Sequence, residues 1–137
     1  PMSGHQRYNT PLLKKIGVKE NQLMLVLNAP SFIMDLLTGE KIVFQTQVSA
    51  SNKYDLIWLF TNKVGELESG LKSLRSILNP TGMIWVSWYK KSSRLNSELY
   101  EDIIRDTALA LDLVDIKVAS VDPSWSALKL VIPINKR

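Results

Sequence analysis

The sequence contains no cysteine, a single histidine and no long uninterrupted hydrophobic run. The absence of cysteine excludes disulfide bonds, thiolate metal sites and cysteine nucleophiles, and it is typical of a reducing compartment. His5 stands in a polar N-terminal stretch, so we interpret it as neither a ligand nor a base, and we predict no metal site. No apolar stretch approaches the roughly 18 residues of a membrane span, and no signal-peptide pattern is present. The expected location is therefore the cytoplasm, without a membrane partner.

Glycine and proline are also scarce, at six residues each, and the chain has no low-complexity tract or internal repeat. A chain of 137 residues has the length of one domain, and at this size roughly two-thirds of the unfolded surface is buried on folding. We therefore predict a single domain over residues 1–137, in which residues 1–10 form a polar, mobile N-terminal segment.

The excess of positive charge is modest, because 17 Lys and Arg residues stand against 13 Asp and Glu residues and give a net charge of +4. The excess falls in two clusters, of which the first holds Arg7, Lys14, Lys15 and Lys19 and the second Lys90, Lys91 and Arg94. Nucleic-acid footprints are usually denser, so we interpret these residues as solvated surface lysines and arginines. A nucleic-acid-binding domain is kept as an alternative, and it requires that the fold join the two clusters into one surface.

The chain is organised around residues 22–37, an apolar stretch that is interrupted once and then resumes at helical spacing. Residues 23–27 are continuously apolar, which is typical of a strand covered on both faces. Pro30 suits the first turn of a helix, and Gly39 supplies a helix end. The stretch predicts a buried strand, a tight turn without glycine, and a helix.

Strand-like and helix-like segments alternate through the rest of the chain. Runs rich in β-branched and aromatic residues predict further strands over 41–46, 54–60, 83–88, 113–121 and 125–132. Start signals and amphipathic spacing predict helices from Thr10 to Gly17, over 64–78 and from Ser97 onward. The short turn over 122–124 makes the last two strands an antiparallel hairpin. The order predicts one α/β domain with a mainly parallel sheet of about six strands and helices on both faces.

Several of these segments resemble the class I S-adenosylmethionine (SAM)-dependent methyltransferase fold, a three-layer Rossmann-like arrangement whose sheet ends in such a hairpin. The resemblance is carried by residues 54–57, the leucine-rich helix, the helix stop over 78–82 and the strand around 85–87. One strand-helix unit of that fold is missing between residues 46 and 54. More closely, the chain is similar to a family of small bacterial domains of unknown function. The stretches that carry this likeness are 10–17, 25–30, 85–91, 113–118, Asp122 and 125–129.

Two anchors of a methyltransferase cofactor site have no counterpart at the expected positions. Where the family has an acidic residue and a glycine-rich loop after the first strand, this chain has residues 28–32, and Pro30 and Phe32 would crowd the ligand. Where the family has a ribose-binding carboxylate after the second strand, it has residues 45–47. These two departures from the family pattern predict a non-catalytic binding domain that lacks the SAM site and uses no cofactor. A divergent SAM-dependent methyltransferase is the alternative.

Ligands of open parallel sheets bind beyond the carboxyl ends of the strands. The candidate ligand-binding residues at this edge are Asn28, Thr61, Trp88, Lys90, Lys91, Asp122 and Trp125. The tryptophans are also explained by packing, the lysines by solubility and Asn28 by helix capping. No catalytic residue is predicted, because no Ser-His-Asp set and no paired carboxylates stand out. The expected partner is an acidic small molecule or protein that meets Lys90 and Lys91.

Overall fold

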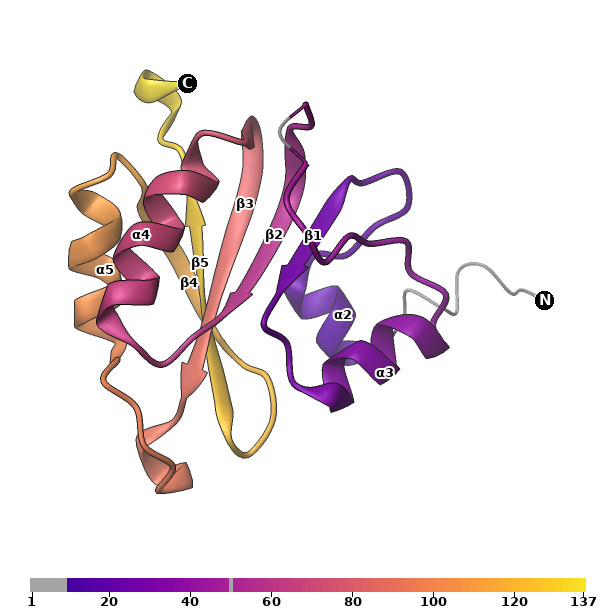
Figure 1. Cartoon of the computed structure of the whole chain (residues 1–137), viewed down its shortest axis with the longest axis vertical. Coiled ribbons are helices and arrows are strands. Elements are labelled where there is room, and N and C mark those ends of the chain that lie inside the picture. Colours follow the sequence, from indigo (N-terminus) through magenta and orange to yellow (C-terminus); the bar gives the residue numbers. More distant parts are fainter. Residues whose placement is uncertain (1–9, 50) are drawn as a thin grey trace.

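The structure, a computed structural model, describes residues 10–49 and 51–137, so His5 and nearly all of the predicted N-terminal segment lie outside the described residues. In the part described, a five-stranded sheet has the strand order β1-β2-β3-β5-β4 (Figure 1). Its strands are β1 (Met24–Leu27), β2 (Tyr54–Phe60), β3 (Leu78–Tyr89), β4 (Val114–Ser120) and β5 (Trp125–Val131). The helices are α2 (Pro11–Ile16), α3 (Ser31–Gly39), α4 (Val64–Arg75) and α5 (Glu101–Leu109), with short 3-10 turns η1 (Lys91–Ser93) and η2 (Ile134–Lys136).

The sheet is mixed. Strands β1, β2 and β3 are parallel neighbours, whereas β5 pairs antiparallel with both β3 and β4. The α/β class and the central unit of β1, turn and α3 are therefore confirmed, with Pro30 at the N-cap of α3. None of the helices in the described ranges has both the length and the apolar character needed to cross a membrane.

The prediction of about six strands is wrong, because the segment 41–46 forms only an isolated parallel bridge between Gln45 and Leu25. The Gln45 amide donates to the Met24 carbonyl over 2.8 Å, and the Val26 amide donates to the Gln45 carbonyl over 2.9 Å. Earlier in the segment, the Ile42 amide donates to the Leu37 carbonyl over 2.9 Å and so completes the end of α3. Because Ile42 bonds back to α3, this part of the segment does not pair with β1. The predicted sixth strand therefore consists of one bridge.

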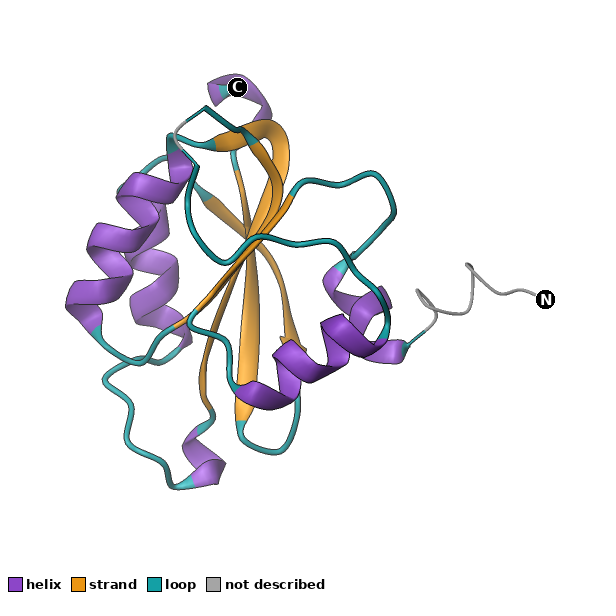
Figure 2. Cartoon of the chain, turned by 45° about the vertical axis from the view of Figure 1, so that its right-hand side comes forward, coloured by secondary structure: helices purple, strands orange, loops and turns teal. Residues whose placement is uncertain are grey.

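Alternating side chains of the central strands fill two separate cores, one on each face of the sheet. Ile57, Leu59 and Val86 pack with the buried leucines of α4 and with Ile104 of α5. The intervening residues of the same strands pack with the buried residues of α2 and α3. Figures 1 and 2 show the result, in which α4 and α5 lie on one side of the sheet and α2 and α3 on the other. Period-two alternation along a strand buried on both faces requires these three layers.

Two helix boundaries differ from the prediction. Helix α4 ends at Arg75 rather than Leu78, because residues 78–82 belong to β3. Helix α5 begins at Glu101, and Ser97 does not cap it. The Ser97 hydroxyl instead accepts the Leu99 amide over 3.0 Å, which closes a local turn. Ser97 has the residue type of an N-cap, but this turn satisfies its side chain before the helix starts.

Gly82 lies where β3 departs from regular pairing with β2. The register shifts between the pairs Tyr54↔Leu78 and Leu56↔Met83, so β3 carries extra residues at this point. Asp55 holds the irregularity, because its carboxylate accepts the Asn79 side-chain amide over 2.6 Å and the Leu23 backbone amide over 2.8 Å. The strands approach so closely that a Cβ atom at Gly82 would lie 2.9 Å from the Asp55 carbonyl oxygen.

We predict that Gly82→Ala lowers the free energy of unfolding by about 1–3 kcal/mol, because the new methyl group meets backbone that cannot rotate away. Chemical denaturation of the variant and the parent measures this difference. The control is Gly65→Ala in α4, where a Cβ has no neighbour within 4 Å. This change should raise the free energy of unfolding by about 0.5–1 kcal/mol, because alanine favours a helix more than glycine does. A Gly82→Ala protein as stable as the parent would contradict the close approach of β2 and β3.

Candidate functional site

The carboxyl ends of β2 and β3 meet the turn between β4 and β5 at one edge of the sheet. The Lys90 amide donates to the Ser124 carbonyl over 2.8 Å, and the Thr61 amide donates to the Ser87 carbonyl over 3.0 Å. Figure 1 shows this edge at the bottom of the view, where the loop that holds η1 lies beside the β4–β5 turn. Backbone hydrogen bonds thus place residues from three distant parts of the chain next to one another.

Asn62 and Glu98 fix the loop that leaves this edge. The Asn62 side-chain oxygen accepts the Tyr89 amide over 2.7 Å, and the Asn62 carbonyl accepts the Glu98 amide over 2.9 Å. The Glu98 carboxylate in turn accepts the Val64 amide over 2.9 Å, at the first residue of α4. The loop between β3 and α5 is therefore bound to the end of β2 at both of its ends.

A pocket of about 330 Å³ lies under this loop, and we call it the strand-end pocket. Its lining residues are Trp88, Tyr89, Lys90, Lys91, Leu95, Ser97, Leu99 and Tyr100. Three predicted site residues, Trp88, Lys90 and Lys91, therefore share one cavity. No local pattern in the sequence predicts Leu95, Leu99 and Tyr100 at this site, because their position depends on the contacts that Asn62 makes with the loop.

Both lysines of the strand-end pocket present their charge toward solvent. The Lys91 side chain is exposed, and within residues 10–49 and 51–137 its ammonium group has no hydrogen bond or ion pair. Lys90 is half-buried, and its ammonium group donates to the Ser120 hydroxyl over 2.6 Å. No carboxylate lines the pocket. The cavity therefore combines two cationic groups with an apolar and aromatic wall, which suits an anion that carries an apolar part.

The two predicted tryptophans do not meet. Trp88 lies opposite Ser126 in the β3–β5 ladder, whereas Trp125 lies opposite Tyr89, so their side chains leave the sheet on opposite faces. Trp125 packs instead on Tyr89, with ring centroids 4.4 Å apart, and on Phe60, with centroids 5.2 Å apart. Both tryptophans are buried, and Trp125 belongs to the core under α2 and α3. Trp88 and Trp125 therefore form no aromatic pair at this edge, although both are candidate residues.

Asp122, Thr61 and Asn28 lie outside the strand-end pocket. The Asp122 carboxylate accepts the Ser124 amide over 2.8 Å and the Trp125 amide over 2.7 Å, so it shapes the turn. Thr61 is buried and donates its hydroxyl hydrogen to Glu66 over 2.8 Å at the start of α4. Asn28 is exposed, has a φ of 60° and makes no capping bond to α3.

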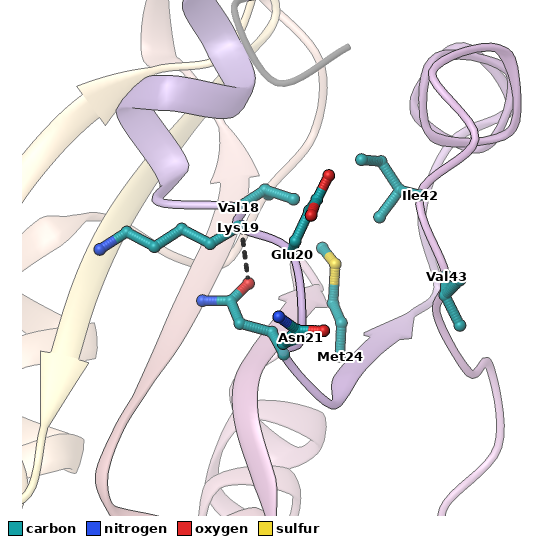
Figure 3. A pocket seen from close by; sticks show the side chains of 8 residues that line it. Val18, Lys19, Glu20, Asn21, Met24, Ile42 and Val43 are labelled. Atoms are coloured by element: carbon teal, nitrogen blue, oxygen red, sulfur yellow. Dashed lines mark hydrogen bonds between the residues drawn. The ribbon is translucent and has the colours of Figure 1, made fainter. Parts of the chain in front are cut away.

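A second hollow, of about 250 Å³, lies at the amino end of β1. Figure 3 shows Glu20, Met24 and Ile42 around it, while the Lys19 side chain points away. It lies at the opposite end of β1 from the edge at which open parallel sheets bind ligands. No metal site is evident either, since the described ranges hold no group of three or more His, Asp or Glu residues that could bind an ion.

Several solved structures of similar architecture are methyltransferases. The chain is similar to a SAM-dependent methyltransferase from Aquifex aeolicus, with a TM-score of 0.64, 13% identity, and coverage of 97% of this chain and 100% of the other. It is similar to N-methyltransferase NodS from Bradyrhizobium japonicum WM9, with a TM-score of 0.61, 12% identity and coverage of 95% and 97%. It is also similar to magnesium protoporphyrin IX methyltransferase from Synechocystis PCC 6803 with bound SAM, with a TM-score of 0.61, 15% identity and coverage of 95% and 80%.

No protein-family model matches the chain, and no curated protein matches it. At identities this low, structural likeness defines the fold alone. The chain has a class I methyltransferase-like fold, and the resemblance to that fold seen in the sequence is confirmed.

We predict that Asp122→Ala lowers the free energy of unfolding by about 1–2 kcal/mol, because two backbone amides of the β4–β5 turn lose their acceptor. Asp122→Asn is the matched control, since the asparagine side-chain oxygen can accept the same two bonds, and it should lose much less. Thermal and denaturant unfolding of both variants measures the difference. Equal stability of Asp122→Ala and the parent would show that the carboxylate does not hold the turn.

Proposed function

We propose that this protein is a non-catalytic binding domain, built on a methyltransferase-like scaffold, that holds an anionic small molecule in the strand-end pocket. The observation that carries the proposal is the free ammonium group of Lys91 beside Lys90, above an apolar wall and without a carboxylate in the lining. The ligand class that fits is a phosphate or carboxylate carried on an apolar or aromatic group. The lysines hold the anion and the wall of Leu95, Leu99 and Tyr100 holds the apolar part.

The turn between β1 and α3 supports a role without methyl transfer. In methyltransferases of this fold a glycine-rich loop at that point lets the backbone approach the cofactor, whereas here the turn consists of Asn28, Ala29 and Pro30. Side chains at these positions occupy space that a glycine-rich loop leaves to the ligand. At the position of the ribose-binding carboxylate stands Gln45, whose side-chain oxygen already accepts the Tyr54 hydroxyl.

A divergent SAM-dependent methyltransferase is the second candidate. The observation in its favour is the likeness to methyltransferases over nearly the whole chain, including one with bound SAM. In that case Asn28 and Thr61, at the carboxyl ends of β1 and β2, would lie beside the cofactor. The two candidates make opposite predictions for SAM.

We predict that isothermal titration calorimetry detects no binding of SAM at micromolar concentration. Naphthyl phosphate, which joins an anion to an aromatic group, should bind, and naphthol, which lacks the anion, should bind at least about tenfold more weakly. Binding of SAM with micromolar affinity would overturn the proposal of a non-catalytic domain in favour of a methyltransferase. Equal affinity for naphthol and naphthyl phosphate would remove the role of the lysines.

We predict that the double change Lys90→Ala with Lys91→Ala leaves folding normal. Lys91 is exposed and the bond of Lys90 to Ser120 lies at the surface, and charge removal at such sites usually changes stability by no more than about 0.5 kcal/mol. The same change should weaken naphthyl phosphate binding at least about tenfold, or by about 1.4 kcal/mol. The control is Lys63→Ala with Lys72→Ala, which removes equal charge from exposed positions outside the pocket. A large drop in the denaturant midpoint would make Lys90 and Lys91 structural, and unchanged affinity would make them ordinary surface lysines.

A further inference from the structure

The fold brings the two basic clusters of the sequence together at Ser120, the last residue of β4. The Lys15 ammonium group donates to the Ser120 carbonyl over 3.1 Å, while Lys90 donates to the hydroxyl of the same residue. Lys15 belongs to the N-terminal cluster and Lys90 to the second one, and they are far apart in the sequence. Each ammonium group has three donors and uses one of them here, so both can still bind an anion.

Further lysines continue this surface along the β4–β5 hairpin. Lys117 and Lys129 are directly opposite each other in the antiparallel ladder. Like charges at such positions destabilise a sheet. In the described part of the chain neither lysine has a carboxylate partner. Burial, together with the positive charges of Lys117 and Lys19, lowers the pKa of Lys129. Lys19 therefore lies within electrostatic range of Lys129.

These lysines are distributed along the β4–β5 hairpin. We define the basic stripe as Lys15, Lys19, Lys117 and Lys129. Lys15 contacts β4 at the Ser120 carbonyl. Ser120 is three residues from Lys117, which corresponds to about 10 Å along the strand. The β4 strand is at the edge of the sheet, so no further strand covers it in the described structure. A linear array of cations on an open edge matches a linear polyanion.

We propose that the basic stripe binds the phosphate backbone of a nucleic acid, without reading its sequence. This goes beyond the anionic small molecule proposed for the strand-end pocket. Release of counterions from the phosphates supplies the free energy of such binding and makes it strongly salt-dependent. The cost of holding Lys117 opposite Lys129 is offset when phosphates lie between or beside them.

A lipid surface fits the basic stripe less well. Binding to an anionic membrane is stronger when apolar side chains insert beside the lysines. The residues that share the face of Lys117 and Lys129 are Trp85, Ala119 and Ala127, and all of them are buried. The exposed Val118 of β4 is opposite Leu128 and faces the other side of the sheet. Apart from Ile116, which is exposed at the bulge just before Lys117, the two strands offer no exposed apolar side chain on this face.

The test is fluorescence anisotropy with labelled single-stranded and duplex DNA of mixed sequence and about 20 nucleotides, at salt from about 50 to 200 mM. Both probes should bind at the lowest salt, and affinity should fall steeply as salt rises. The triple change Lys19→Gln, Lys117→Gln and Lys129→Gln should weaken binding at least about tenfold and reduce the salt slope by about 2 to 3. Its thermal midpoint should equal or exceed that of the parent, because repulsion between like charges is removed.

The control triple is Lys41→Gln, Lys63→Gln and Lys72→Gln, which removes the same charge from exposed positions elsewhere. If the control binds DNA about as tightly as the parent, the proposal is supported. If both triples lose the same affinity, net charge alone explains the binding and the proposal is overturned. Absence of binding to either probe at about 50 mM salt also overturns it, as does binding to anionic vesicles but not to DNA. Both triples keep Lys90 and Lys91, so their affinity for naphthyl phosphate should equal that of the parent. The proposal for the basic stripe can therefore fail without affecting the proposal for the strand-end pocket.

Discussion

The burial of β2 and the second half of β3 on both faces is the constraint on which the rest of the structure depends. From Leu56 to Phe60 every side chain is buried, and alternate residues belong to different cores. Such strands need helices on both sides, and here α4 with α5 and α2 with α3 supply them. Two buried indole groups inside these layers are paired: the Trp58 indole N–H donates to the buried Ser87 hydroxyl over 2.9 Å, and the Trp85 indole N–H donates to the Ile16 carbonyl over 2.7 Å. An unpaired buried group of this kind would cost about 1–3 kcal/mol.

Because both faces of β2 and the second half of β3 are covered, these two strands can offer only their ends for binding. The carboxyl ends of β2 and β3 carry Asn62 and Lys90, whose backbone and side-chain bonds join the loop before α5 to the β4–β5 turn. Lys90 of the strand-end pocket and Lys15 of the basic stripe both bond to Ser120. Positive charge therefore gathers at one region of the surface although the net charge of the whole chain is only +4. A modest excess becomes a directional field when the fold concentrates it.

The sequence predicted those features that depend on local pattern. Residues 23–27 and Pro30 were sufficient for the β1–α3 unit, and the leucine spacing of Leu67, Leu71 and Leu74 was sufficient for α4. These signals are strong because burial on one or both faces dictates each residue type. The class of fold followed from the alternation of such segments, and the resemblance to methyltransferases narrowed it further.

Features that depend on pairing between distant segments could not be predicted in this way. The segment 41–46 has the composition of a strand, but completing the end of α3 uses part of it. The opposite faces of Trp88 and Trp125 follow from the register of β3 with β5, which no local pattern contains. The meeting of Lys15 and Lys90 at Ser120 likewise depends on where α2 lies against the sheet. Sequence clusters of charge thus say little about surfaces until the topology is known.

The central claim is that ligands meet this scaffold at the carboxyl end of β3 rather than at the turn after β1. An amide NMR titration with naphthyl phosphate and then with SAM tests it directly, because each amide reports its own surroundings. The account predicts that naphthyl phosphate shifts the amides of Tyr89 to Tyr100 and leaves those of Asn28 to Phe32 unchanged, and that SAM shifts neither set. Shifts at Asn28 to Phe32 and at Gln45 on addition of SAM would contradict it, and would place a methyltransferase cofactor site where the fold usually has one.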